Sequence, residues 1–244
     1  MLSSIKNFFL DTILPPLCIV CEKHLVGDES ARKVCDRCWN SVPTNDYLLC
    51  PTCFNRMPTI RICHPETPYL LAAATDYGHP VMRKVIHQFK YTGWQSLADP
   101  LGQLLIAFLK KQNDIRYRSD IGYRFEDWLV VPVPLARSRE RERGFNQAEL
   151  LAERVNREIG ARWLKDNLVR EKDTLPQAEL KDWRGREENI RDAFGVVDSM
   201  KFADRNILLV DDVFTSGSTI NEAARVLKLN GAKKIIALVV AKAR

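Results

Sequence analysis

The segment Ile207–Thr219, with the sequence ILLVDDVFTSGST, constrains the fold more than any other part of the chain. Four apolar residues lead directly into two carboxylates, and a short stretch of hydroxyl-bearing residues and glycine follows. Apolar residues then recur at helical spacing as far as Leu227, before a second apolar run at 235–240. This order of strand, loop, helix and strand predicts a right-handed βαβ unit, and therefore an α/β protein with a largely parallel sheet.

The loop between this strand and helix has the chemistry of a phosphate site. Backbone N–H groups at the start of a helix point toward an anion, and the helix dipole favours negative charge there. Glycine lets the backbone approach the anion, and hydroxyl groups add donors. The candidate phosphate-binding residues are Thr215, Ser216, Gly217, Ser218 and Thr219. Asp211 and Asp212 would repel a phosphate, so we expect them to face sugar hydroxyls or a divalent cation.

Other proteins also carry an apolar strand that ends in acidic residues. A P-loop ATPase needs a Gly-Lys pair in its phosphate loop, and this chain contains none. A receiver domain continues well beyond its acidic pair, whereas only residues 213–244 follow here. A buried strand capped by solvated acids remains an alternative, but it does not require carboxylates, hydroxyls and glycine together. The sequence therefore favours a sugar-phosphate site.

A second candidate anion site follows the apolar run 128–133, which predicts a strand that ends at its prolines. Arginine occupies four of the seven positions from 137 to 143. Guanidinium groups bind pyrophosphate through paired hydrogen bonds, so Arg137, Arg139 and Arg143 are candidate ligands. The alternative is a solvated loop in which arginine and glutamate neutralise each other. The position between a strand and Gly144 favours an anion site, at least for Arg143.

Seven cysteines lie between positions 18 and 63, and none follows. This clustering predicts a local metal module rather than a disulfide framework. Two Cys-x-x-Cys pairs together supply four thiolates to one tetrahedral zinc ion. The candidate ligands are Cys18, Cys21, Cys35 and Cys38. Cys50, Cys53 and Cys63 would need one more ligand for a second zinc, and His64 is the nearest. An equally acceptable interpretation is that these three cysteines bind no metal and are held by packing alone.

Composition and charge leave the class of partner open. The net charge of +6 permits an anionic partner such as nucleic acid but does not require one. No apolar stretch approaches the length of a membrane span, and residues 1–16 do not resemble a signal peptide. Free thiols and metal binding favour the cytoplasm. We expect two domains, a zinc ribbon module at 1–66 and a larger domain at 67–244.

The remaining elements are predicted from their apolar spacing. Strands are expected near 69–77, 163–170 and 193–197, and helices at 81–91, 97–110 and 146–159. The polar segments 113–127 and 171–191 are predicted to be loops.

The motif Val210–Thr219 resembles the binding motif for 5-phosphoribosyl 1-pyrophosphate (PRPP) in type I phosphoribosyltransferases. With the sequence RERGFNQA at 141–148 and the cysteine pairs, the whole chain resembles the ComF family of competence proteins. The resemblance implies the type I phosphoribosyltransferase fold preceded by a double zinc ribbon. In that pattern a fourth cysteine of the second zinc site would fall at Glu66, so this chain departs from the family there.

The resemblance also implies roles. Asp211 and Asp212 would bind the ribose, Mg²⁺ would join ribose and pyrophosphate, and Arg139 and Arg143 would hold the leaving group. Lys90 lies in the stretch His87–Tyr91, which resembles a family segment of lysine followed by phenylalanine or tyrosine, and would reach a substrate phosphate. The polar segment 171–191 would be a lid that closes over PRPP. Its candidate residues are Arg184, Arg186 and Asn189.

Three functional hypotheses follow, and the acceptor is not identified by the sequence. The first is a phosphoribosyltransferase that uses PRPP and Mg²⁺. The second is a sensor of PRPP or of a related phosphorylated sugar, without turnover. The third, which the family name implies, is a competence accessory protein that binds single-stranded DNA beside a ComF-type helicase and other competence proteins. The third hypothesis is compatible with the first.

Overall fold

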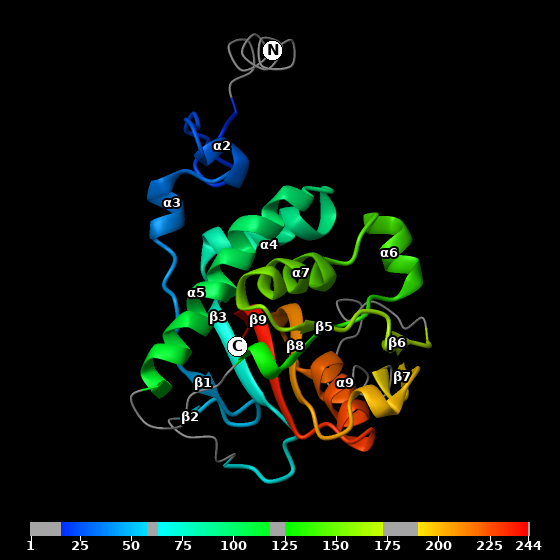
Figure 1. Ribbon diagram of the computed structural model, residues 1–244. Helices are drawn as coiled ribbons and strands as arrows, with labels where there is room; N and C mark the ends of the chain where they lie inside the picture. The colour runs from blue at the N-terminus through cyan, green and yellow to red at the C-terminus, as the bar shows by residue number, and fades with distance from the viewer. Residues whose placement is uncertain (1–15, 58–62, 118–124, 173–189, 244) are drawn as a thin grey trace.

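The computed structural model describes residues 16–57, 63–117, 125–172 and 190–243. These residues form an α/β structure around one seven-stranded sheet (Figure 1). From edge to edge, its strands are β2 (Arg56–Met57), β1 (Leu48–Leu49), β3 (Leu70–Asp76), β9 (Lys234–Lys242), β8 (Asn206–Phe214), β4 (Leu129–Pro132) and β5 (Arg162–Trp163). The five strands from β3 to β5 are parallel, and β1 and β2 are antiparallel to their neighbours. The predicted, largely parallel sheet is confirmed.

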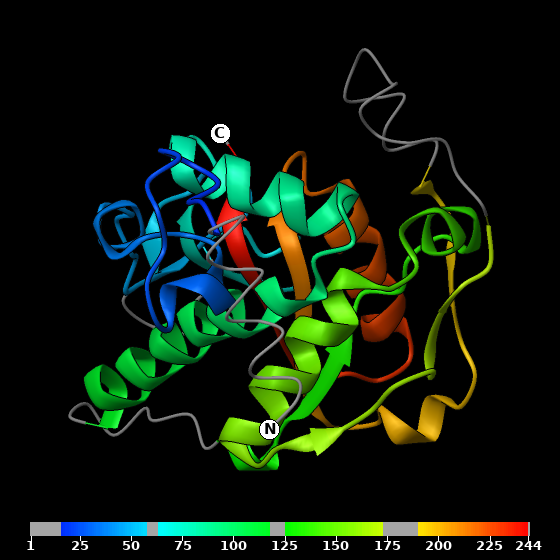
Figure 2. The ribbon, with the colours of Figure 1, turned by 90° about the horizontal axis from the view of Figure 1, so that it is seen from above.

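The central strands are apolar on both sides because both faces of the sheet are covered. Residues 207–210 of β8 are fully buried, and so is most of β9. One face packs against α4 (Pro80–Tyr91), α5 (Ala98–Tyr117) and α7 (Gln147–Ile159), and the other against α9 (Ser218–Leu229). Figures 1 and 2 show α5 and α7 on one side of the sheet and α9 on the other. This arrangement brings the loops after β4 and β8 to the same edge of the sheet.

Residues from the predicted zinc module contribute to the main sheet. The β1–β2 hairpin encloses residues 50–55, and Leu49 pairs with Leu71 of β3. The short helices α2 (Glu29–Arg32) and α3 (Asp36–Asn40) lie in the first part of the module, and α2 packs near the 3₁₀ turn Gln95–Leu97. The cysteine-containing segments are therefore joined to the main fold by backbone pairing as well as by packing.

Several predicted elements differ from the structure. Residues 137–143, expected to be a loop, form helix α6 (Arg137–Arg143), because arginine and glutamate are good helix formers and Gly144 ends the helix with φ = 79°. The helix expected at 97–110 continues to Tyr117, so part of the segment expected to be a loop is helical. The acidic pair 211–212 lies inside β8, which extends to Phe214 rather than ending before the carboxylates.

The strand expected at 163–170 is two strands that belong to different sheets. Between β5 and β6 (Leu168–Arg170), Asp166 has φ = 62°, which turns the chain away from the main sheet. β6 instead pairs antiparallel with β7 (Phe194–Val196). The side chain of Asn167 fixes this turn, since it donates to the Asp198 carbonyl and accepts from the Asp198 N–H. The strand expected at 193–197 is thus also outside the main sheet.

Candidate functional site

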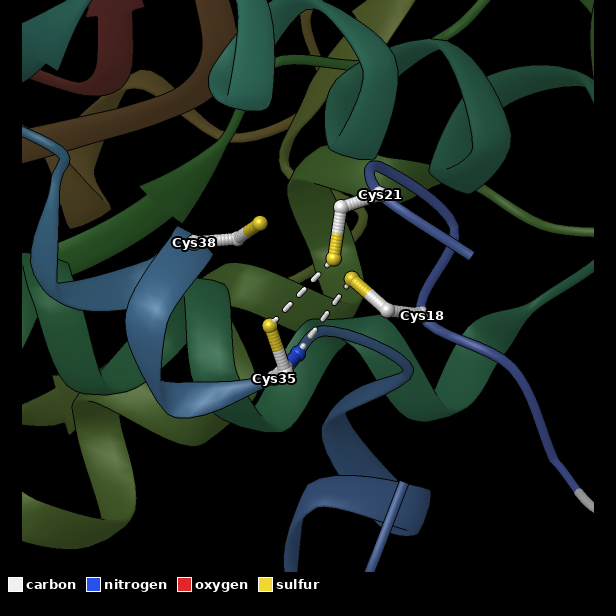
Figure 3. A group of neighbouring side chains, drawn as sticks. All are labelled: Cys18, Cys21, Cys35 and Cys38. Atoms are coloured by element: carbon white, nitrogen blue, oxygen red, sulfur yellow. Dashed lines mark hydrogen bonds between the residues drawn. The ribbon is translucent and has the colours of Figure 1, made fainter. Parts of the chain in front are cut away.

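The first cysteine cluster has the geometry of a tetrahedral zinc site. The ligand atoms of Cys18, Cys21, Cys35 and Cys38 all lie within 4.8 Å of one another, and Figure 3 shows the side chains pointing toward a common centre. The Cys21 and Cys35 sulfurs are 3.7 Å apart. Sulfurs bound at about 2.3 Å to one tetrahedral ion would be about 3.8 Å apart. The predicted four-cysteine site is therefore assembled, and the donor set fits zinc.

Backbone donors prepare one thiol of this cluster for metal binding. The Cys18 sulfur accepts N–H groups from Val20 at 3.5 Å and from Cys35 at 3.4 Å. Burial raises the pKa of the Cys18 thiol, but these and other donors outweigh it and lower the pKa to about 6. Burial and the neighbouring thiols raise the pKa of Cys38. Four thiolates in such proximity need a cation, and zinc supplies one.

The second cluster repeats the turn of the first. The N–H of Phe54 donates to the Cys50 carbonyl at 2.9 Å, as the N–H of Glu22 does to the Cys18 carbonyl at 2.9 Å. Backbone donors again overcome burial and lower the pKa of the Cys50 thiol to about 6. A turn of this kind, called a knuckle here, comprises residues 18–23 in the first site and 50–55 in the second. The shared geometry indicates that the second knuckle is also a metal site.

The fourth side chain of the second cluster is His64. Its Nδ1 lies 3.4 Å from the Cys50 sulfur and 3.2 Å from the Cys63 sulfur, and the Cys53 and Cys63 sulfurs are 3.4 Å apart. All four ligand atoms lie within 4.8 Å of one another. Glu66 is exposed and does not belong to the group. Three cysteines and one histidine are a common zinc ligand set, so the residues fit a second zinc ion.

A pocket of about 530 Å³ lies at the edge of the sheet where β4 and β8 end. It brings together several predicted site residues that are far apart in sequence. Those that line it are Lys90, Arg139, Arg143, Asp211, Asp212, Thr215 and Thr219. Ser216, Gly217 and Ser218 lie in the same loop but not in the lining, and Arg137 lies elsewhere. The predicted lid residues Arg184, Arg186 and Asn189 are outside the described residues.

The acidic pair and Lys90 form the centre of the pocket. Lys90 Nζ is 2.8 Å from Asp212 Oδ1, and both side chains are largely buried. Burial would lower the pKa of Lys90, but the attraction of Asp212 outweighs it and raises the pKa. Asp211 Oδ1 accepts the N–H of Asp212 at 2.8 Å. Lys90 was expected to reach a substrate phosphate; here it neutralises one carboxylate of the pair.

The environment of Asp211 differs from that of its neighbour. Burial, and then repulsion by Asp212, raise the pKa of the Asp211 carboxyl to about 7. Lys90, the N–H of Asp212 and Arg170 oppose this increase without reversing it. The carboxyl therefore changes charge near neutral pH. A ligand with hydroxyl groups or a cation at this position would favour the carboxylate form.

The loop Thr215–Thr219, called the phosphate loop below, turns into α9 at Gly217. This glycine has φ = 81°, and its carbonyl accepts the N–H of Asn221 at 2.7 Å. The hydroxyls of Ser216 and Ser218 are hydrogen-bonded at 2.9 Å. The first turn of α9 thus starts beside the pocket, with Thr215 and Thr219 in its lining. This is the arrangement expected for a phosphate at a helix N-terminus.

The helical form of α6 separates its arginines into two groups. Arg139 and Arg143 are four residues apart, so they share a face and line the pocket. Arg143 Nη1 donates to Gln147 Oε1 at 2.9 Å, and its guanidinium carbon is 5.0 Å from the centre of the Tyr91 ring. Arg137 instead lines a separate surface hollow with Glu140, Arg141 and Gly144. Only two of the three predicted arginines are therefore placed at the acidic pair.

Several lining residues were not among the predicted site residues, although some of them lie beside Lys90 or within the motif at 141–148. They are Tyr77, His87, Tyr91, Glu142, Gln147 and Arg170. His87 and Tyr91 lie on one face of α4, with ring centres 4.9 Å apart. Because residues 81–91 were predicted to be a helix, the spacing of four residues between His87 and Tyr91 could have indicated that both side chains lie on the same face, next to Lys90. Arg170 reaches the pocket from β6, and no local pattern could predict that placement.

No helix in the part of the chain that the structure describes is long and apolar enough to cross a membrane.

Two domain families match the chain. A double zinc ribbon domain matches residues 9–65, and a phosphoribosyl transferase domain matches residues 162–244. The first match covers both cysteine clusters, and the second covers the acidic pair and the phosphate loop.

Curated relatives share most of the length of the chain. The DNA utilization protein YhgH of Escherichia coli strain K12 is 31% identical over 229 residues, which are 91% of this chain and 95% of the relative. Competence protein ComFC of Bacillus subtilis is 26% identical over 234 residues, 88% of this chain and 90% of the relative. Competence protein F of Haemophilus influenzae is 37% identical over 107 residues, 43% of this chain and 46% of the relative.

Proposed function

Because the chain belongs to the ComF family, in which a double zinc ribbon is joined to a phosphoribosyltransferase domain, we propose that it binds PRPP with Mg²⁺ and transfers the phosphoribosyl group in a competence-related process. One observation carries the proposal. A single pocket contains an acidic pair, the start of a helix rich in hydroxyls, and two arginines from a neighbouring element. These groups suit a sugar that carries phosphates at both ends.

In this proposal each part of PRPP meets a different element. The 5′-phosphate lies at the phosphate loop, where backbone N–H groups and the hydroxyls of Thr215 and Thr219 donate to it. Asp211 accepts hydrogen bonds from the ribose hydroxyls. Arg139 and Arg143 bind the pyrophosphate through their guanidinium groups. Carboxylate oxygens suit Mg²⁺, so Asp211 would also hold the ion, which would supply positive charge to the departing pyrophosphate.

The side chains would act through position and charge rather than through covalent attack. A nitrogen nucleophile displaces pyrophosphate at the anomeric carbon, and positive charge develops on the ribose as the bond breaks. Carboxylates beside the ribose stabilise that charge, while the arginines stabilise the leaving group. Lys90 neutralises Asp212 and so limits the repulsion between the acidic pair and the pyrophosphate.

Calorimetry with PRPP and Mg²⁺ tests the site directly. Asp211→Asn should weaken PRPP binding by about tenfold or more, because a charged acceptor of ribose hydroxyls is lost. Asp204→Asn is the matched control, since the Asp204 side chain is 82% exposed and pairs with Lys233 at the surface. Absence of binding to the unsubstituted protein, or an equal effect of the two substitutions, would rule out this site for PRPP.

Turnover requires a separate measurement, because a sensor would bind PRPP without consuming it. Release of pyrophosphate should be followed with ammonia and with a panel of nucleobases as nitrogen acceptors. Release that depends on an acceptor and is lost in Arg139→Ala identifies a transferase. Binding without release under all acceptors would favour the sensor hypothesis.

A second candidate function is binding of single-stranded DNA, as the names of the relatives suggest. Arg137 and Arg141 favour it, because both are exposed on the face of α6 that is turned away from the PRPP pocket. Binding to an oligonucleotide should weaken steeply with salt, and the paired substitution Arg137→Ala with Arg141→Ala should reduce the salt dependence. Binding that is absent or insensitive to salt would exclude this function for α6.

A further inference from the structure

A contact joins the second zinc knuckle to the residue that precedes the phosphate loop, although they are more than 150 residues apart in sequence. The ring of Phe54, in the second knuckle, lies edge-on to the ring of Phe214 at the end of β8, with centres 6.1 Å apart and planes at 82°. Lys242 Nζ, on β9, lies 5.7 Å from the centre of the Phe54 ring. Edge-to-face pairs of this kind are favourable beyond their buried area.

The knuckle itself determines where Phe54 points. Phe54 has φ = 57°, a left-handed conformation that is unfavourable for a residue with a side chain. The N–H···O bond to Cys50 and the bond from the Cys50 N–H to the Asn55 carbonyl close the turn around it. Glu22 occupies the same position in the first knuckle, with φ = 62°. Both side chains are exposed, Phe54 at 40%, but the Phe54 ring also contacts Phe214. The two knuckles thus share a backbone, and only the second directs an aromatic ring onto the main domain.

Phe214 transmits this contact to the phosphate loop. A Cβ atom at Gly217 would lie 2.6 Å from Cζ of Phe214, so the ring occupies the space directly above this glycine. Phe214 is 3% exposed, and α9 begins immediately after Gly217. A shift of the Phe214 ring would therefore change the space available to the turn that orients the backbone N–H groups of the loop.

Polar contacts tie the same two regions together a second time. The hydroxyl of Thr52, in the knuckle, is hydrogen-bonded to that of Thr67 at 2.9 Å. Two residues further along the chain, the hydroxyl of Tyr69 donates to Asn221 Oδ1, in the first turn of α9, at 2.5 Å. In the first part of the module, helix α2, which lies between the two cysteine pairs of the first zinc site, packs in a different place, near the 3₁₀ turn Gln95–Leu97.

We propose that the second zinc knuckle is a positioning element for the phosphate loop, acting through Phe54 and Phe214, so that loss of its metal ligands loosens the loop and weakens phosphate binding. Phe54 does not touch the ligand; it acts through the residue that packs on Gly217. The effect on affinity rests on the proposed PRPP function, whereas the effect on the loop does not.

Hydrogen exchange of the zinc-loaded, full-length protein without PRPP measures the loop directly. Phe54→Ala should speed exchange of the amides at 216–221 by roughly threefold to tenfold, which corresponds to the loss of one aromatic pair. Amides of α7 should be unchanged, and so should the zinc content. Phe54→Tyr should restore slow exchange because it keeps the ring. Glu22→Ala, at the equivalent position of the first knuckle, is the matched control and should have no effect on 216–221.

Metal ligands give an independent variant. Cys53→Ser should lower the zinc content and speed exchange at 216–221, whereas Cys21→Ser should lower the zinc content without that effect. Titration with PRPP should then show weaker binding for Phe54→Ala and Cys53→Ser only. Unchanged exchange at 216–221 in Phe54→Ala would overturn this inference whether or not PRPP binds. If the unsubstituted protein does not bind PRPP, the proposed function is wrong. The exchange result at 216–221 then still decides whether the second knuckle positions the phosphate loop.

Discussion

At the scale of single residues, the ion pair between Lys90 and Asp212 controls the charge of the pocket. The pair is largely buried, with side-chain exposures of 20% and 9%. A buried carboxylate that loses its partner is strongly destabilising, because its desolvation is no longer compensated. Lys90→Met should therefore lower the free energy of unfolding by about 3 kcal/mol.

Urea denaturation of the two lysine variants tests this expectation. Lys110→Met is the matched control, since Lys110 pairs with Glu158 at the surface and its side chain is 64% exposed. Surface pairs contribute little, so the control should lose much less stability than Lys90→Met. Similar losses in both variants would show that the pocket pair is solvated and does not behave as a buried one.

Asp211 makes the stability of the protein depend on pH. Its pKa in the folded protein, about 7, is above the ordinary value of 3.8, so the folded state holds a proton that the unfolded state has released. Stability from this group is therefore lost as pH rises from about 4 to about 7. Asp211→Asn cannot titrate, and its stability relative to the unsubstituted protein should increase across that same pH range. If denaturation shows that the difference in unfolding free energy between the two proteins stays constant over this pH range, the raised pKa is contradicted.

At the scale of elements, the turn from β8 into α9 depends on a glycine. Gly217 combines a left-handed φ of 81° with a space already filled by Phe214. Gly217→Ala should cost at least about 2 kcal/mol of unfolding free energy, from backbone strain and the collision together. Gly160→Ala is the strain control, because Gly160 has φ = 65° and an added Cβ atom there would have no other atom within 4 Å. If thermal unfolding shows that Gly217→Ala and Gly160→Ala lower the unfolding free energy equally, the Phe214 ring moves aside without an energetic cost.

Helix α6 makes a different prediction about its arginines. Arg139 faces the pocket and Arg137 does not. Arg139→Ala should weaken PRPP binding by about tenfold, the usual effect of losing one charged hydrogen-bonding group, while Arg137→Ala should leave it nearly unchanged. Calorimetry measures the affinity of both variants for PRPP. Equal losses would indicate that residues 137–143 bind pyrophosphate as an extended loop rather than as a helix.

At the scale of the whole molecule, we expect zinc ions at the two cysteine clusters to stabilise the segments that hold them. The protein should contain two equivalents of zinc per chain by elemental analysis, and chelation should lower the melting temperature. His64→Ala should reduce the content toward one equivalent, because His64 completes the second cluster. Glu66→Ala should retain two equivalents, since Glu66 is outside the cluster. The opposite result would identify Glu66, rather than His64, as the fourth ligand.

The sequence alone determined the features whose signals are local. Apolar runs such as 207–210 and 235–240 predicted the central strands, because a strand covered on both faces must be apolar throughout. The Cys-x-x-Cys pairs predicted the first zinc site, because one tight turn presents both thiolates. The hydroxyls and glycine at 215–219 predicted where a phosphate would bind, because a strand, a turn and a helix start are consecutive in the chain.

The tertiary structure decided the features that depend on contacts between distant segments. It paired Lys90 with Asp212, brought His64 to three cysteines, turned Arg170 toward the pocket and placed Phe54 on Phe214. It also separated Arg137 from Arg139, because residues 137–143 form a helix rather than a loop. Spacing along a chain specifies which residues share a turn or a face, whereas packing of elements specifies which faces meet.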